Sequence, residues 1–200
     1  MNIKKTAISA FSAVIILGLS ASAATHTVVR GDTMWKIANK YEVGTREIIN
    51  ANPDVENPDL IYPGQVLNLP AKDKSVSSFE TEVIRLVNIE RSKNGLLPLS
   101  HDWELSRVAR YKSMDMKENN YFSHTSPTFG SPFDMMKSFG ISYRSAGENI
   151  AKGQTTPQKV VNSWMNSQGH RANILNKSYT HIGVGYVKSG NYWTQMFIQK

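Results

Sequence analysis

The chain has 200 residues, a formal net charge of +7 and no cysteine. The lack of cysteine excludes disulfides, a thiol nucleophile and thiolate metal sites, so the fold must depend on ordinary core packing. The cationic residues are scattered, with no run of five or more, and this favours a solvated surface over a nucleic-acid-binding site.

The first 24 residues have the organisation of an export signal. Lys4 and Lys5 precede an apolar stretch at 7–19, and small residues follow at 21–23, which is the pattern that a signal peptidase accepts. The apolar stretch is shorter than the roughly 20 residues that a membrane-spanning helix needs. We therefore predict a cleaved signal peptide over 1–24, a secreted protein and no transmembrane segment in the mature chain.

Residues 25–70 predict a small β-α-α-β module. A β-prone run precedes a turn at Gly31, and Thr33 is placed to cap a first helix. A second helix is expected after Gly44, and a returning strand at 66–69. This module carries four Lys/Arg and six Asp/Glu, whereas the rest of the chain from residue 71 carries seventeen and ten.

Three motifs of this module, T-V-V-R-G-D-T-M-W-K-I-A, I-I-N-A-N-P and N-P-D-L-I-Y-P-G-Q-V-L-N-L-P, cover it almost from end to end. They resemble a LysM domain. The resemblance implies binding to glycans that contain N-acetylglucosamine, chiefly peptidoglycan in bacteria, and a place in the cell wall or on the spore surface. It also implies that two facing loops contact the glycan, formed by Gly31, Asp32, Thr33 and Met34 and by Pro58, Asp59, Leu60 and Ile61.

The chemistry of sugars agrees with this use. A sugar has polar edges and C–H faces, so its groove needs backbone hydrogen-bonding groups beside apolar side chains. Met34, Leu60 and Ile61 are candidates for the apolar part, although each is equally expected to complete a very small core. Asp32 is open to a second interpretation too, because a helix-initiating turn favours Asp for capping alone.

A single module of this kind should bind weakly. A second contact on the same polymer would strengthen retention by raising the effective concentration. We expect the basic second domain to provide that contact with anionic wall polymers.

Residues 71–78 are short and polar and are expected to form a flexible linker. Beyond them, helical spacing of apolar residues and a β-prone hairpin predict an α+β domain over 79–200. The expected elements are helices over 79–94 and 102–116, shorter helices beginning at Ser131 and Thr156, and strands at 182–187 and 192–198.

The second domain contains the motifs L-V-N-I-E-R, Y-F-S-H-T-S-P, G-E-N-I-A, W-M-N-S-Q-G-H-R-A-N-I-L, H-I-G-V-G-Y and Y-W-T-Q-M-F. These motifs resemble the CAP family, also called SCP-like, in its cysteine-free bacterial form. The resemblance implies a three-layer α-β-α sandwich with a central polar cavity in an exported protein. Family members have varied roles, including lipid binding, proteolysis and defence, so membership predicts no single reaction.

The resemblance also implies candidate residues for that cavity, which better-known members build from two histidines and two glutamates. The first histidine matches His124 and the first glutamate matches Glu148. Ser167 stands where the second glutamate is expected and Tyr192 where the last histidine is expected, so half of the tetrad is missing. In the bacterial pattern, His170 is expected to return an imidazole to the cavity.

His124, Glu148 and His170 would form a set of two imidazoles and one carboxylate. Such a set suits acid/base catalysis, or a divalent metal such as zinc held through His124 and His170 with an open coordination position. Each residue also has a structural interpretation: His124 bonds its own loop, Glu148 accepts amides from its own turn, and His170 lies where the helix from Thr156 ends. The sequence lacks H-E-x-x-H and G-x-S-x-G motifs, so a zinc protease or a serine hydrolase has no local support.

We therefore expect an exported, wall-associated protein that binds peptidoglycan through a LysM module and carries a CAP domain of unresolved activity. One alternative is a metal-dependent or acid/base hydrolase acting on wall or peptide material, and another is a structural or interaction protein of the envelope or spore coat. His26, His101 and His181 are expected at the surface or in loops. The aromatic residues expected in the core of the second domain are Tyr121, Phe122, Trp164, Tyr186, Trp193 and Phe197.

Overall fold

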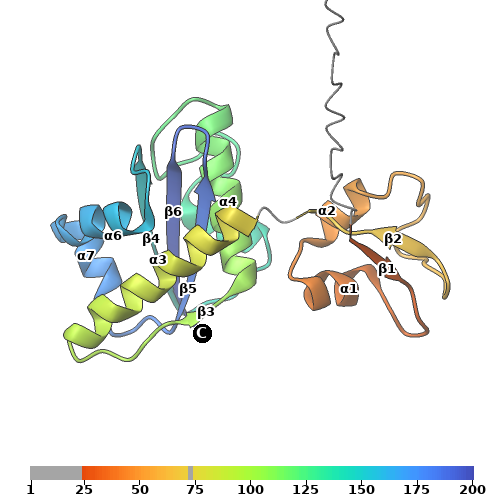
Figure 1. Cartoon of the computed structure of the whole chain (residues 1–200), viewed down its shortest axis with the longest axis horizontal. Coiled ribbons are helices and arrows are strands. Elements are labelled where there is room, and N and C mark those ends of the chain that lie inside the picture. The colour runs from red at the N-terminus through yellow and green to blue at the C-terminus, as the bar shows by residue number, and fades with distance from the viewer. Residues whose placement is uncertain (1–23, 72–73) are drawn as a thin grey trace, which may run out of the picture.

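The computed structural model describes residues 24–71 and 74–200, which form a small N-terminal module beside a larger domain (Figure 1). Apart from Ala24, the signal peptide expected at 1–24 lies outside the described residues. Within the two described ranges, none of the helices is long and apolar enough to cross a membrane.

The N-terminal module has the β-α-α-β order that the sequence predicts. Its two strands pair antiparallel, with Thr25 opposite Asn68. Thr33 caps the first helix, because its hydroxyl accepts the backbone N–H of Lys36. The elements are β1 (Thr25–Thr27), α1 (Met34–Tyr41), α2 (Thr45–Asn50) and β2 (Val66–Asn68).

This module has a core of its own. Asn52 joins α2 to β2, since its side-chain amide donates to the carbonyls of Ile48 and Asn68 at 2.7 and 2.8 Å. Its side-chain oxygen accepts the N–H of Asn68 at 2.7 Å. The buried apolar residues are Val28, Met34, Ile37, Ala38, Val43, Ile48, Leu67 and Leu69. The module therefore packs around a cluster that the larger domain does not share.

The larger domain is a three-layer α-β-α sandwich, which confirms the expected fold class. The sheet order is β3-β5-β6-β4, with β3 and β5 parallel and the other neighbours antiparallel. Helices α3, α6 and α7 pack on one face, and α4 and α5 on the other. The elements are α3 (Lys74–Lys93), β3 (Ser100–His101), α4 (Trp103–Glu118), α5 (Pro132–Ser138), β4 (Ser145–Lys152), α6 (Pro157–Met165), α7 (Gln168–Ile174), β5 (His181–Val187) and β6 (Tyr192–Gln199).

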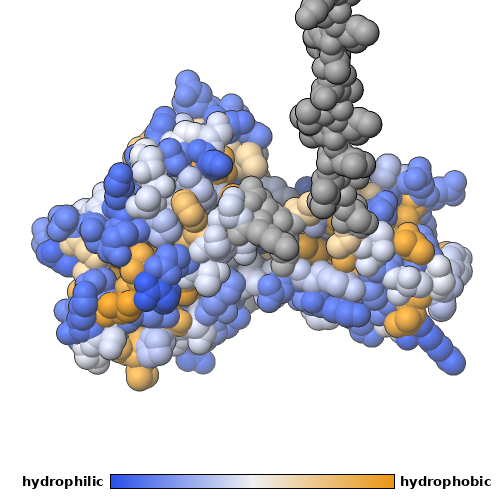
Figure 2. Space-filling view, viewed as in Figure 1, coloured by the Kyte–Doolittle hydropathy of each residue, from blue (hydrophilic) through white to orange (hydrophobic). Residues whose placement is uncertain are grey.

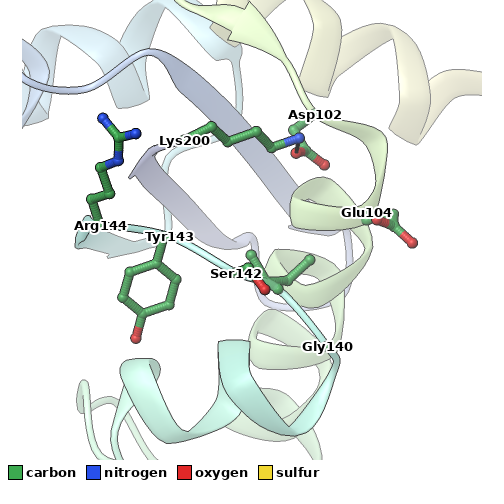
Figure 3. A pocket seen from close by; sticks show the side chains of 8 residues that line it. Asp102, Glu104, Gly140, Ser142, Tyr143, Arg144 and Lys200 are labelled. Carbon is green, nitrogen blue, oxygen red and sulfur yellow. Dashed lines mark ion pairs between the residues drawn. The ribbon is translucent and has the colours of Figure 1, made fainter.

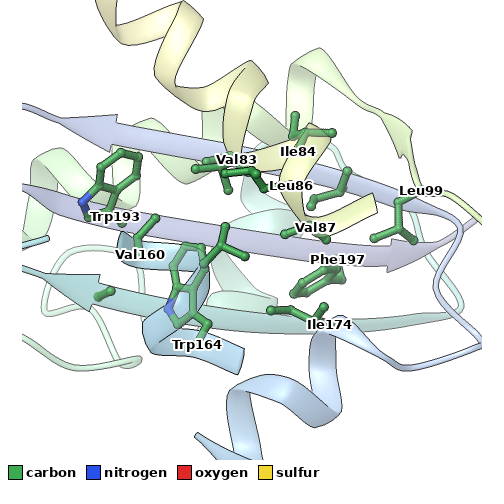
Figure 4. Packing of buried hydrophobic residues seen from close by; sticks show 14 of the residues in the cluster. Val83, Ile84, Leu86, Val87, Leu99, Val160, Trp164, Ile174, Trp193 and Phe197 are labelled. Atoms are coloured by element: carbon green, nitrogen blue, oxygen red, sulfur yellow. The ribbon is translucent and has the colours of Figure 1, made fainter. Parts of the chain in front are cut away.

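Aromatic side chains fill the core between the sheet and its first face of helices. Figure 4 shows Trp164 of α6 beside Trp193 and Phe197 of β6, opposite the apolar residues of α3. All three side chains are fully buried, as the sequence predicts. Phe122 is an exception because it lies in the loop after α4 and is half exposed, so the core expectation is wrong for that residue.

Two glycines allow α4 to approach β5 closely. A Cβ atom added at Gly183 would lie 2.3 Å from the carbonyl carbon of Leu105, and one at Gly185 would lie 2.1 Å from that of Ala109. Ser113 then reaches the strand, and its hydroxyl donates to the carbonyl of Gly185 at 3.1 Å. The sheet and α4 thus form a rigid platform for the loop that follows α4.

The secondary structure differs from the expectation at the linker and at three elements of the larger domain. The linker expected at 71–78 is wrong from Lys74 onward, because α3 begins there and Val76 packs against the domain core. Strands β3 and β4 and helix α7 were not predicted. The sequence of β4, S-A-G-E-N-I-A-K, has little β propensity of its own, and its pairing along the whole of β6 makes it a strand.

Candidate functional site

Two of the three expected cavity residues lie in direct contact at an edge of the sheet. Glu148 is in the middle of the edge strand β4, and its side chain is 1% exposed. Its Oε1 lies 2.7 Å from Nδ1 of His124, whose side chain is 54% exposed. A buried carboxylate therefore anchors an imidazole at the surface. The interpretation of Glu148 as a residue serving its own turn is wrong, because it lies within a strand.

The loop that carries His124 is held by one carboxylate of α4. Asp115 accepts hydrogen bonds from Asn119, Tyr121, Ser126 and Thr128. Burial would raise the pKa of Asp115, but these bonds, that of the Ser126 hydroxyl foremost, lower it overall. The sequence pattern did not predict this arrangement. Asp115 and its four partners lie within residues 115–128 and meet only because the loop folds back on α4.

Lys112 lies beneath the same loop with its side chain fully buried. Its Nζ donates to the carbonyl of His124 at 2.7 Å and to the hydroxyl of Tyr121 at 3.1 Å. Burial lowers the pKa of Lys112, while the negative charges of Glu148 and Asp115 oppose that effect. Lys112 therefore fixes the backbone at His124 and places a positive charge near Glu148. Within the described residues, Oε2 of Glu148 is buried and has no hydrogen-bond partner.

His170 lies on α7, a helix separate from α6, so it does not merely end the helix from Thr156. Burial lowers the pKa of His170, and the charge of His124 lowers it further, which places the two imidazoles within electrostatic reach of each other. Asn149 donates to the carbonyl of His170 at 3.1 Å, and Asn173 donates to the carbonyl of Glu148 at 3.1 Å. These amides tie α7 to β4 and hold His170 beside the pair of His124 and Glu148.

Metal binding through His124 and His170 stays a prediction. Among residues 24–71 and 74–200, no three His, Asp or Glu side chains are placed to hold a metal ion together. Ser167 and Tyr192, the two departures from the tetrad, contribute no acid or imidazole: Ser167 precedes α7, and Tyr192 is buried against Met116 and Ile150. The arrangement is suited to holding or moving a proton at the exposed nitrogen of His124.

The glycan-binding loops expected in the N-terminal module are fixed by polar contacts. Asp32 accepts the N–H of Val29 at 2.9 Å and pairs with Nε2 of His26 at 2.8 Å. The bond from Val29, followed by that from His26, lowers the pKa of Asp32. His26 is itself buried and bonds Tyr41 through Nδ1 at 3.0 Å. The expectation of a surface or loop position is therefore wrong for His26, which lies in β1.

The apolar candidates of these loops divide between core and surface. Met34 is 5% exposed and belongs to the core of the module, so its side chain fits the structural interpretation. Ile61 packs partly against that core, whereas Leu60 is 52% exposed. Trp35 and Tyr62 were not among the predicted residues, although they adjoin the expected loops and are 64% and 60% exposed. An aromatic residue directly after each expected loop was the feature of the sequence that could have identified them.

Figure 2 shows apolar side chains on the surface of the N-terminal module among largely hydrophilic neighbours.

Two of the hollows among the described residues are large enough for a small ligand. One, of about 510 Å³, is bounded by the start of α4, residues 140–144 and Lys200. The other, of about 470 Å³, has residues of both modules in its wall, including Glu47 and Arg107. Neither is lined by His124, Glu148 or His170.

Comparison with known proteins agrees with this division of the chain. Residues 84–199 match the cysteine-rich secretory protein family (CAP), and residues 26–70 match the LysM domain. A stretch of 126 residues is 68% identical to the uncharacterized protein YkwD of Bacillus subtilis, covering 63% of this chain and 49% of the relative. A stretch of 47 residues is 45% identical to SpoIVD-associated factor A of the same organism, covering 24% and 12%.

Among solved structures, an extracellular protein containing an SCP domain from Bacillus anthracis matches with a TM-score of 0.61 and 36% identity. The match covers 69% of this chain and 47% of that protein. The chain thus spans half or less of the length of these relatives. The family matches agree with the fold and with the separate cores of the two modules. The chain belongs to the cysteine-rich secretory protein family, and it carries a LysM domain ahead of its CAP domain.

Proposed function

We propose that this is a secreted protein held at the cell wall by its LysM domain, which binds N-acetylglucosamine-containing glycan chains of peptidoglycan. The binding surface comprises the loop from Gly31 to Met34 and the loop from Pro58 to Ile61. The strongest support is that hydrogen bonds of Asp32 hold the first loop in place while Leu60 of the second loop is exposed. A preformed loop offers backbone groups to the sugar edges at little entropic cost, and an exposed apolar side chain suits the C–H faces.

The contribution of Leu60 can be tested without the wall. We expect N-acetylglucosamine tetramer to bind the full chain in a calorimetric titration, and Leu60→Ala to weaken binding about tenfold through lost apolar contact. Leu97→Ala removes an equally large side chain that is 83% exposed on the CAP domain and serves as the matched control. Equal affinity of the two variants would remove Leu60 from the groove.

A second candidate function is acid/base hydrolysis of wall or peptide material at the CAP domain. It is favoured by the exposed imidazole of His124 resting on the buried carboxylate of Glu148. In this arrangement Glu148 fixes the ring, while the outer nitrogen exchanges a proton with the substrate or water.

This candidate predicts that soluble fragments appear when the protein is incubated with purified sacculi. His124→Gln and Glu148→Gln should each abolish their release, and release should persist in a chelator because the proton chemistry needs no metal. Full activity in both variants would exclude the pair from the chemistry. Release that stops in the chelator would favour the metal-dependent alternative.

Two further roles remain proposals. The similarity of a 47-residue stretch to SpoIVD-associated factor A favours a structural or interaction role at the envelope or spore coat as the third candidate. The excess of basic residues beyond residue 71 favours an additional contact with anionic wall polymers. Retention on walls should then fall as salt rises. Retention independent of salt would remove that contact.

A further inference from the structure

The hollow of about 510 Å³ in the CAP domain is distinct from the pair of His124 and Glu148. Its wall consists of the first turn of α4, the segment 140–144 and Lys200 at the end of the chain's last strand. Its volume lies in the range typical of sites for small ligands. Ile141, which is buried, forms the apolar part of the floor.

The charges of this hollow are balanced in number but not all paired. Asp102 is buried and pairs with Nζ of Lys200 at 2.8 Å, while it also caps α4 by accepting the N–H of Leu105. The side chains of Arg144 and Glu104 have no hydrogen-bond or ion-pair partner in the described part of the chain. One acidic and one basic side chain of the wall therefore pair with each other, and one of each kind remains unpaired.

The two unpaired charges lie on opposite sides of the hollow. Figure 3 shows Arg144 at the left, Glu104 at the right and Ser142 between them. Arg144 is held in place through its backbone, because its N–H donates to the carbonyl of Gln199 at 2.8 Å. Arg144 and Glu104 thus line the hollow on opposite sides, with a polar and partly apolar floor between them.

We propose that this hollow binds a short zwitterionic peptide, with the peptide's carboxylate at Arg144 and its ammonium group at Glu104. A guanidinium matches a carboxylate through two parallel hydrogen bonds, and a carboxylate accepts from an ammonium group. The balanced lining gives no advantage to a ligand of a single charge. Because both charges are near the surface, affinity is modest and falls with salt. The proposal does not depend on glycan binding.

The test uses the full chain and tri-alanine with free termini, titrated by NMR or calorimetry at low salt. We expect saturable binding, which Arg144→Gln and Glu104→Gln each weaken about fivefold or more. Lys177→Gln and Glu118→Gln remove the same charges from exposed positions outside the hollow and should leave affinity unchanged. Tri-alanine with an acetylated N-terminus and an amidated C-terminus should not bind.

Several outcomes would overturn the proposal. Absence of saturable binding by tri-alanine, or equal binding of the blocked peptide, would exclude recognition of the termini. Acetate binding as tightly as tri-alanine, with an effect of Arg144→Gln alone, would show a simple anion site. Glycan and sacculi are absent from this experiment, so its failure is distinguishable from failure of the LysM proposal.

Discussion

The LysM and CAP domains use their polar residues in opposite ways. In the LysM domain, His26 and Asp32 are tied together to fix a loop, and the side chains left at the surface beside it are apolar. In the CAP domain, Glu148 and Lys112 are buried, and the group left at the surface is the ionisable His124. The comparison indicates that the first domain is built for contact and the second for the placement of charge or protons.

The largest expected effect comes from a tryptophan in the core of the CAP domain, compared with a tryptophan on the surface of the LysM domain. Trp164→Ala should lower the free energy of unfolding of the CAP domain by about 3–5 kcal/mol, because it removes a fully buried indole. Trp35→Ala, at an exposed indole of the LysM domain, should change stability by less than about 0.5 kcal/mol. Chemical denaturation followed by circular dichroism measures both. Similar losses would contradict the assignment of Trp35 to the surface.

The next effect concerns a buried carboxylate of the CAP domain. Burial raises the pKa of Glu80 from 4.5 to about 7, although Arg110 opposes the shift. Since the folded state then holds a proton that the unfolded state releases, stability should fall as pH rises from about 4.5 to 7 and level off above it. A shift of this size corresponds to about 3 kcal/mol.

Glu80→Gln should remove that slope while keeping an acceptor for the N–H of Tyr186. The lowered pKa values of His170 and His181 have the opposite effect to that of Glu80, because they make the folded state less stable as pH falls. The difference between variant and wild type, measured by urea unfolding from pH 4.5 to 8, isolates Glu80. Parallel pH profiles would disprove the assignment.

A smaller effect is expected where α4 packs on β5. Gly185→Ala would place a Cβ against the backbone of Ala109 and should cost about 1–3 kcal/mol through forced separation of the helix and strand. Gly169→Ala meets nothing within 4 Å and lies in α7, so it should be neutral or slightly stabilising. Thermal unfolding of the pair decides the point. Equal melting temperatures would mean that α4 shifts freely.

The smallest effect is expected between the domains. Tyr111 of α4 donates to Oε1 of Glu47 in α2 at 2.9 Å, and burial together with Glu47 raises the pKa of Tyr111 to about 12. Glu47→Gln should change the unfolding of either domain by less than about 1 kcal/mol. A larger loss in both transitions would show that the two domains unfold as one unit.

Sequence patterns predicted the elements whose signals are local. The caps at Thr33, Asp102 and Ser131 and the hairpin of β5 and β6 lie where turn chemistry and periodicity place them. Strand β4 was missed because its stability comes from pairing with β6 rather than from its residues. The local pattern also predicted a flexible linker up to residue 78, but the polar residues from Lys74 onward form the first turns of α3.

The candidate site was only partly predictable. The resemblance supplied His124 and Glu148, and the fold brings them into contact. Lys112 and Asp115 gave no signal, because a lysine and an aspartate on a helix normally indicate a solvated face. Both residues become buried only when the loop after α4 folds over them, and they then hold that loop through hydrogen bonds. For Met34 the sequence left glycan contact and core packing equally open, and its side chain lies in the core.

The division of roles between the domains is tested most directly on purified peptidoglycan sacculi. The mature chain, a deletion of residues 25–70 and His124→Ala are each incubated with sacculi, and pelleted protein and soluble fragments are measured. We expect the deletion to abolish pelleting, whereas His124→Ala should pellet like the mature chain. The deletion removes a module with its own core, so the CAP domain should stay folded. Pelleting that survives the deletion would show that the LysM domain is not the anchor and would assign retention to the basic CAP domain.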